Sequence, residues 1–130
     1  MKLEFLLIDD DEITIMLSEI LLEDFPEFIQ IKTFSDGLYA LDYLKNEYCE
    51  STKYIISLDI NMPLMNGWEF LEEITPFVSV KNTMVFMLSS STDKEDMDRA
   101  AGIALVKSFF SKPLDENHLK EITAFLALPQ

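Results

Sequence analysis

The sequence has little cysteine, few basic residues and no long apolar run, and each shortage excludes a class of protein. Cys49 is the only cysteine among 130 residues, so no internal disulfide framework is possible, which suits a reducing cytoplasm. The chain has 10 Lys and Arg residues beside 24 Asp and Glu residues, and its formal net charge is −14. Nucleic-acid binding is therefore not expected, because it depends on clustered Lys and Arg.

The sequence also shows neither a membrane segment nor a signal peptide. A membrane span needs about 18 consecutive apolar residues, and no such run occurs. The start, "MKLEFLLIDDDE", carries one lysine and a short apolar run that ends in four acids, without the small-residue cleavage site of a signal peptide. Apolar residues nevertheless make up 48% of the chain, which is ample for one core. We expect a single cytoplasmic domain over residues 1–130, without membrane contact.

Short apolar runs alternate along the chain with segments whose apolar residues recur at helical intervals. The runs predict five strands, at 3–8, 28–34, 54–58, 83–88 and 108–110. The helical segments lie between and after them, at 11–25, around 38–44, at 68–74, up to about 101 and at 114–126. Regular alternation predicts right-handed crossovers and a doubly wound parallel sheet with helices on both faces. Continuously apolar strands are typical of such a buried sheet.

Polar side chains follow four of the predicted strands. Asp9 and Asp10 follow the first strand, and Asp59 follows the third. Ser89 follows the fourth strand and Lys112 the fifth. Because ligand sites in such sheets lie outside the carboxyl ends of the strands, we expect these side chains to lie close together.

The predicted cluster has the chemistry of a magnesium site beside a nucleophile. Carboxylates without histidine or thiolate favour a hard cation, and so few acids suit Mg²⁺ with water better than a calcium cage. We expect Asp10 and Asp59 to hold the ion. A carboxylate that is ionised at neutral pH can attack phosphorus without a general base, and Mg²⁺ and Lys112 would neutralise the charge of the transferred group. These residues predict that Asp59 accepts a phosphoryl group.

Four stretches together resemble the receiver domain of two-component response regulators. They are "LLIDDDE" (6–12), "IISLDINMPLMNGWEFL" (55–71), "VFMLSSS" (85–91) and "FFSKPL" (109–114). The resemblance runs from about residue 2 to residue 127. It implies a flavodoxin-like three-layer α/β sandwich, in which five helices surround a five-stranded parallel sheet of order 2-1-3-4-5.

The resemblance also implies roles for the residues around the acceptor. Asp59 corresponds to the phosphoacceptor, and Lys112 would pair with the phosphoryl group. Asp10 corresponds to the direct metal ligand, whereas Asp9 would reach the metal through water. Asn61, two residues after the acceptor, would give its backbone carbonyl to the metal.

Further residues correspond to the switch of the family. Ser89 stands where a Thr or Ser bonds the phosphoryl group, and the bond before Pro113 is expected to be cis. Phe109 stands where an aromatic ring turns inward on activation. Phe110 is its rival, because the stretch 102–112 is longer than in compact chemotaxis-type receivers.

The implied function is that of a stand-alone response regulator in a phosphorelay. It is a phosphoprotein switch and not an enzyme acting on other substrates. A histidine kinase or a histidine phosphotransfer protein would donate the group that becomes the aspartyl phosphate of Asp59, in a Mg²⁺-dependent reaction. A downstream protein would bind the fourth helix, fifth strand and fifth helix.

Two alternatives remain open. One is an interaction module with the same fold that works without phosphorylation. The other is a phosphatase with an Asp nucleophile, but such enzymes need a second acid where this chain has Asn61.

The first predicted helix has apolar residues on two faces. We expect the larger face to pack on the core: Ile13, Met16, Leu17, Ile20 and Leu21. Ile15 and Leu22 lie nearly opposite. They would either help to dock a phosphohistidine donor or, in the interpretation we favour, be isolated exposed apolar residues of the kind common on protein surfaces.

Overall fold

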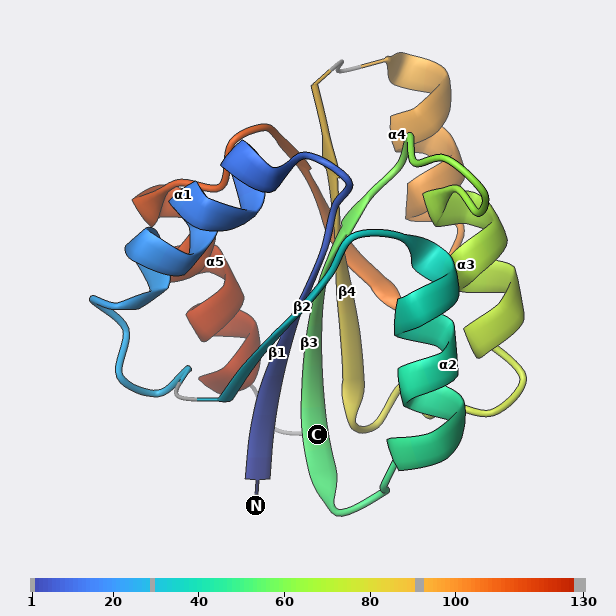
Figure 1. Cartoon of the computed structure of the whole chain (residues 1–130), viewed down its shortest axis with the longest axis horizontal. Coiled ribbons are helices and arrows are strands. Elements are labelled where there is room, and N and C mark those ends of the chain that lie inside the picture. Colours follow the sequence, from blue (N-terminus) through green and yellow to red (C-terminus); the bar gives the residue numbers. More distant parts are fainter. Residues whose placement is uncertain (1, 29, 91–92, 128–130) are drawn as a thin grey trace.

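The computed structural model of the chain describes residues 2–28, 30–90 and 93–127. Within these ranges five strands alternate with five helices, as the sequence predicts (Figure 1). The elements are β1 (Lys2–Ile8), α1 (Glu12–Leu22), β2 (Gln30–Phe34), α2 (Gly37–Glu47), β3 (Thr52–Asp59), α3 (Gly67–Ile74), β4 (Thr83–Ser89), α4 (Lys94–Ala101), β5 (Val106–Ser111) and α5 (Glu116–Ala127). None of these helices is long and apolar enough to cross a membrane.

All strand pairs are parallel, and the sheet has the order β2-β1-β3-β4-β5. Figure 1 shows α1 and α5 on one face of the sheet and α2, α3 and α4 on the other. Each face has its own buried apolar cluster, and every residue of β4 is buried. The predicted doubly wound three-layer sandwich and its strand order are thereby confirmed.

Short polar side chains begin four of the helices. The side chains of Asp11, Asp36, Asn66 and Asp93 each accept a backbone N–H of the first helical turn. Asn66 and Glu69 form a reciprocal capping box. These caps satisfy N–H groups that would otherwise lack partners. The caps at Asp11 and Asn66 fix where α1 and α3 begin after β1 and β3.

Helix α1 differs from its prediction in length and in orientation. It ends at Leu22 rather than near residue 25. Its buried residues are Thr14, Ser18 and Leu22, and Ile15 is half-buried against the apolar cluster on the face of the sheet that α1 and α5 cover. Leu21 packs against the core as predicted, but the other four predicted core residues are exposed: Ile13 63%, Met16 53%, Leu17 47% and Ile20 55%. We call these four residues the α1 strip.

The reversed orientation has a physical reason. Apolar residues occupy so much of the circumference of α1 that their spacing does not select one face. Thr14 and Ser18 are small, so a face that contains them can pack closely on the sheet, and the Thr14 hydroxyl is satisfied by the Asp11 carboxylate at 3.0 Å. The expectation that Leu22 is exposed was therefore wrong.

Candidate functional site

Three acids and one lysine meet at the carboxyl edge of the sheet. Carboxylate oxygens of Asp9, Asp10 and Asp59 all lie within 4.8 Å of one another. Lys112 Nζ lies 2.8 Å from Asp9 Oδ2 and 3.2 Å from Asp59 Oδ1. The structure therefore brings together residues that are far apart in the sequence, because β1, β3 and β5 all end at this edge.

Asp9 is fixed from several directions. Its backbone N–H donates to the Phe34 carbonyl of β2 at 3.1 Å. Its Oδ1 atom accepts the backbone N–H of Asp11 at 2.9 Å, and its buried Oδ2 atom faces the Lys112 ammonium. Asp10 is exposed, and one of its carboxylate oxygens still lies within 4.8 Å of those of Asp9 and Asp59. The pair therefore offers one rigid buried carboxylate and one carboxylate that solvent can reach.

Asp59 is the last residue of β3, and only 4% of its surface is exposed. Burial and the nearby Asp9 charge raise its pKa to about 7, although Lys112 opposes the shift. Burial alone would lower the pKa of Lys112, but its contacts with Asp9 and Asp59 raise the pKa on balance. The shift favours the protonated form of Asp59 relative to an ordinary carboxyl group. A bound cation would favour the ionised form instead.

The donor set suits Mg²⁺. Its side-chain ligands would be hard carboxylate oxygens, and one of the three acids is open to solvent, as a hydrated ion requires. Asn61 follows in the loop after β3 and is exposed. Two buried acids share one lysine, so the pocket retains negative charge that a divalent cation would neutralise.

The loop after Asp59 folds back on itself. The backbone N–H of Gly67 donates to the Ile60 carbonyl at 2.8 Å. A β-carbon on Gly67 would lie 2.6 Å from the Asp59 carbonyl oxygen, a distance that side chains do not tolerate. Leu64 has a positive φ of 69°. The sequence reasoning missed the positioning role of Gly67, although a glycine between an acid loop and a helix is a usable signal of close backbone approach.

The ends of β4 and β5 are joined beside the acids. The backbone N–H of Lys112 donates to the Ser89 carbonyl at 2.7 Å, and Ser89 is buried. The bond between Lys112 and Pro113 is cis, as the resemblance implies. Ser89 and Lys112 are therefore held next to each other at the edge of the sheet.

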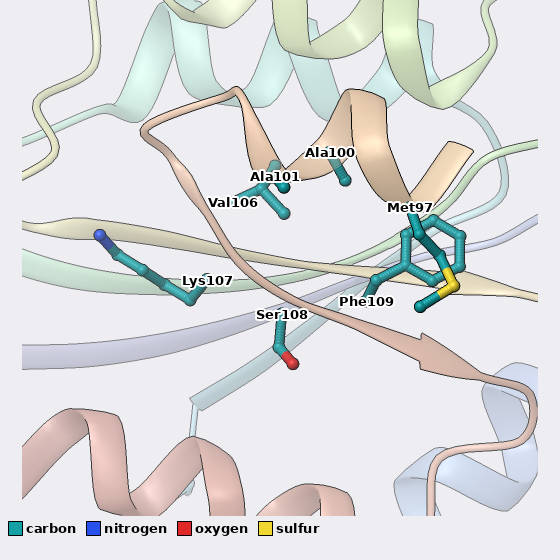
Figure 2. A pocket seen from close by; sticks show the side chains of 7 residues that line it. All are labelled: Met97, Ala100, Ala101, Val106, Lys107, Ser108 and Phe109. Atoms are coloured by element: carbon teal, nitrogen blue, oxygen red, sulfur yellow. The ribbon is translucent and has the colours of Figure 1, made fainter. Parts of the chain in front are cut away.

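The two candidate switch aromatics face opposite sides of the sheet. Phe109 is half-buried and lines a cavity of about 260 Å³ together with Met97 and Ala100 of α4 (Figure 2). Phe110 is buried and stacks between Phe86 and His118, with ring centroids 5.6 Å and 4.2 Å away.

A bulge in β5 accounts for this arrangement. Val85 pairs with Val106 but Phe86 pairs with Ser108, so Lys107 is an extra residue. In Figure 2, Ser108 points away from α4, and its hydroxyl lies 2.6 Å from Glu121 of α5. Because side chains alternate along a strand, Phe109 faces α4.

The profile of the response regulator receiver domain matches residues 5–124, and the chain belongs to this family. Among curated relatives, a homologue of the transcriptional regulatory protein CpxR from Haemophilus influenzae is 37% identical over 119 residues. That match covers 89% of this chain but 46% of the relative. A protein-glutamate methylesterase of Methanospirillum hungatei is 30% identical over 117 residues, covering 90% of this chain and 33% of the relative. The chain thus spans less than half the length of these two relatives.

Solved structures agree in fold. A two-component response regulator from Cytophaga hutchinsonii has a TM-score of 0.88 and 30% identity, with 96% of each chain covered. CheY of Borrelia burgdorferi, in a complex with CheX, BeF₃ and Mg²⁺, has a TM-score of 0.80 and 28% identity, covering 98% of this chain and 90% of that one. The protein is therefore a receiver domain homologous to response regulators of two-component signalling.

Proposed function

We propose that this receiver domain accepts a phosphoryl group on Asp59 from the phosphohistidine of a histidine kinase or a histidine phosphotransfer protein. The observation that carries the proposal is the placement of Lys112 Nζ between Asp9 and Asp59, at 2.8 Å and 3.2 Å, in a pocket that solvent reaches through Asp10. Residues 1–130 would act as one cytoplasmic receiver domain. The chain would be a switch and not an enzyme that turns over other substrates.

The transfer requires little covalent chemistry from the protein. A carboxylate oxygen of Asp59 forms a bond to phosphorus, the bond from phosphorus to the histidine nitrogen breaks, and that nitrogen keeps the electron pair. Lys112 pairs with an oxygen of the incoming phosphoryl group and neutralises part of its charge. This new contact replaces part of the present contact of Lys112 with Asp9 and Asp59. Later attack by water on phosphorus returns the free Asp59 carboxylate and inorganic phosphate.

Mg²⁺ fits the acids of the pocket. Asp10 and Asp59 would bind it directly, Asp9 through a water, and Asn61 through its backbone carbonyl. When bound, the ion neutralises charge on the phosphoryl oxygens and keeps Asp59 ionised. The raised pKa of Asp59 supports this requirement, because burial and the Asp9 charge favour the protonated form of the acid when no cation is bound.

The α1 strip supports a docking surface for the phosphodonor protein. Its four large apolar side chains are exposed on one helix, and that helix starts two residues after Asp10. A donor must bring its phosphohistidine to Asp59, so contacts close to the acids would also align the transfer. The docking residues would therefore be those of the α1 strip and not Ile15 and Leu22.

The output surface would be the face formed by α4, β5 and α5. Arrival of about two negative charges at Asp59 would draw the Ser89 hydroxyl and rearrange the segment that leads to α4. Phe109 would then repack in the α4–β5 cavity, which it already lines, and a downstream protein would bind the changed face. Phe110 is a poorer candidate because its ring is stacked on both sides.

Intact-mass spectrometry tests the proposal. Incubation with phosphoramidate and Mg²⁺ should add one phosphoryl group to the native chain and none to Asp59→Asn. Asp42→Asn, a change at an exposed acid of α2, is the matched control and should be modified like the native chain. A native chain that stays unmodified would favour the interaction module that works without phosphorylation. Repeated hydrolysis of a phosphate ester would favour the phosphatase.

A further inference from the structure

Helix α4 is held to the rest of the domain by few buried contacts. It has eight residues, of which only Ala100 is buried, and Met97 is 43% exposed. Arg99 of α4 contacts the neighbouring helix α3. The Arg99 guanidinium lies over the ring of Trp68 in α3, with its central carbon 4.4 Å from the ring centroid. At this distance a guanidinium is attracted by the ring face.

Trp68 lies next to the loop that follows Asp59. It directly follows Gly67, whose backbone lies against the Asp59 carbonyl and donates to Ile60. The ring is buried in the same apolar cluster as Ile60 and Ala100. A displacement of the loop after Asp59 would therefore move the surface on which Arg99 rests.

The other end of α4 is tied to the same site. Strand β4 ends at Ser89, one residue after Leu88, which pairs with Asp59, and α4 begins at Lys94, so four residues of the chain separate Ser89 from the helix. Movement of Ser89 toward a phosphoryl group would therefore pull on α4. The Arg99–Trp68 contact would resist that pull, because it joins α4 to α3.

We propose that Arg99 is a positioning residue that restrains α4 in the unphosphorylated state through its contact with Trp68. This inference rests on the proposed phosphorylation of Asp59. The nearby ion pair between Arg99 and Glu72 does not account for the restraint. Its atoms are 4.0 Å apart and both side chains are well exposed, at 54% and 76%, so solvent screens it.

The restraint has a measurable consequence. If the Arg99–Trp68 contact favours the resting state, its removal should shift the equilibrium toward the activated state, which binds a phosphoryl mimic more tightly. A cation–aromatic contact at a partly exposed site corresponds to about a two- to fivefold change in such an equilibrium. Arg99→Ala should therefore bind fluoroberyllate with Mg²⁺ about two- to fivefold more tightly than the native chain.

Calorimetric titration with fluoroberyllate and Mg²⁺ tests this inference on the whole chain. Arg99→Lys keeps a cation near the ring and should lie between the native chain and Arg99→Ala. Glu72→Gln removes only the exposed ion pair and should match the native chain. Lys94→Ala, which removes an exposed cation from the same helix, is the matched control and should also match.

Fluorescence provides a second measurement without the mimic, since Trp68 is the only tryptophan. Arg99→Ala should shift its emission and make it easier to quench with acrylamide, and Glu72→Gln should not. Unchanged Trp68 emission in Arg99→Ala would show that Arg99 does not contact the ring. If Arg99→Ala were less stable but bound fluoroberyllate like the native chain, the role of Arg99 would be merely structural. A native chain that binds no fluoroberyllate would instead overturn the proposed function, and the positioning role with it.

Discussion

Gly67 lies so close to Asp59 that the two backbones leave no room for a side chain between them. A β-carbon on Gly67 would be 2.6 Å from the Asp59 carbonyl oxygen and 3.0 Å from the Ile60 Cα atom. Both neighbours are backbone atoms, which cannot turn aside as a side chain can. The glycine therefore allows α3 to start directly against the acceptor strand.

Gly67→Ala should displace the acceptor loop. We expect a loss of about 1–3 kcal/mol in the free energy of unfolding, together with slower phosphorylation by phosphoramidate. Gly102→Ala is the matched control, because a β-carbon there would be 3.6 Å from its nearest neighbour, Arg99 O. Urea unfolding and intact mass measure the two effects. Equal behaviour of the two variants would contradict the close-approach argument.

Lys112→Met should leave two buried carboxylates without their shared cation. We expect a loss of roughly 1–3 kcal/mol of stability at pH 8 in the absence of Mg²⁺, because an unpaired buried charge is costly. Phosphorylation should also fall, since Lys112 no longer neutralises the transferred group. Lys120→Met removes an exposed lysine of α5 and should change stability by less than about 0.5 kcal/mol. A stable, fully active Lys112→Met variant would disprove the role.

Asp59 should make stability fall as pH rises through neutrality in Mg²⁺-free buffer. Its pKa is about 7 in the folded chain against 3.8 for an unperturbed Asp side chain, so the folded state binds more protons between these values. The contribution of Asp59 to the free energy of unfolding is fully present below pH 3.8 and is lost as pH rises through about 7.

Asp59→Asn should remove this part of the pH dependence. At pH 8 the variant should be more stable than the native chain by roughly 2 kcal/mol, about half of what an isolated group would give, because Asp9 and Lys112 titrate with Asp59. At pH 4 the two proteins should be similar. Urea unfolding at both pH values with a chelator measures the difference, and an equal gain at pH 4 and pH 8 would refute the assignment.

Leu64→Asn should stabilise the domain. Leu64 has φ 69° and is 79% exposed, so it occupies a left-handed conformation and buries little surface. Asn tolerates this conformation better, and we expect a gain of about 0.5–1 kcal/mol in thermal or urea unfolding. Leu64→Ala keeps the unfavourable conformation and should give no gain. A similar gain from Ala would point to removal of exposed apolar surface instead.

The α1 strip should matter for a protein donor but not for a small one. Ile13→Ser with Leu17→Ser should slow transfer from a phosphorylated histidine phosphotransfer protein at least several-fold, because both residues are exposed beside the acids. Phosphorylation by phosphoramidate should stay unchanged, which separates docking from chemistry. Val80→Ser, in the segment between α3 and β4, is a control for loss of an exposed apolar side chain, because Val80 is 48% exposed. Equal transfer rates in all three proteins would remove α1 from the docking surface.

The proximity of Asp9, Asp59 and Lys112 could be predicted from the sequence, because it depends only on the placement of the strand ends. Apolar runs locate the strands, parallel strands place their carboxyl ends at one edge, and each of these residues comes at or just after such an end. Their exact roles depend on a bound phosphoryl group, so Ser89, Asn61 and Phe109 remain predictions.

The orientation of α1 and the direction of Phe109 could not be predicted in the same way. In α1 the choice of face depended on how closely Thr14 and Ser18 let the helix approach the sheet, and apolar spacing does not contain that information. In β5 the bulge at Lys107 shifts the alternation of side chains by one residue. Such a shift arises from pairing with β4 and leaves no clear mark in the strand's own residues.

The acceptor pocket takes its acids and its lysine from positions 9, 10, 59 and 112, which only the paired sheet brings within reach. An unfolded chain consequently has no comparable cation site. Any divalent ion that binds the pocket must then shift the folding equilibrium toward the native state by mass action. The concentration of free Mg²⁺ around the domain would thereby set its resistance to unfolding as well as its readiness to react.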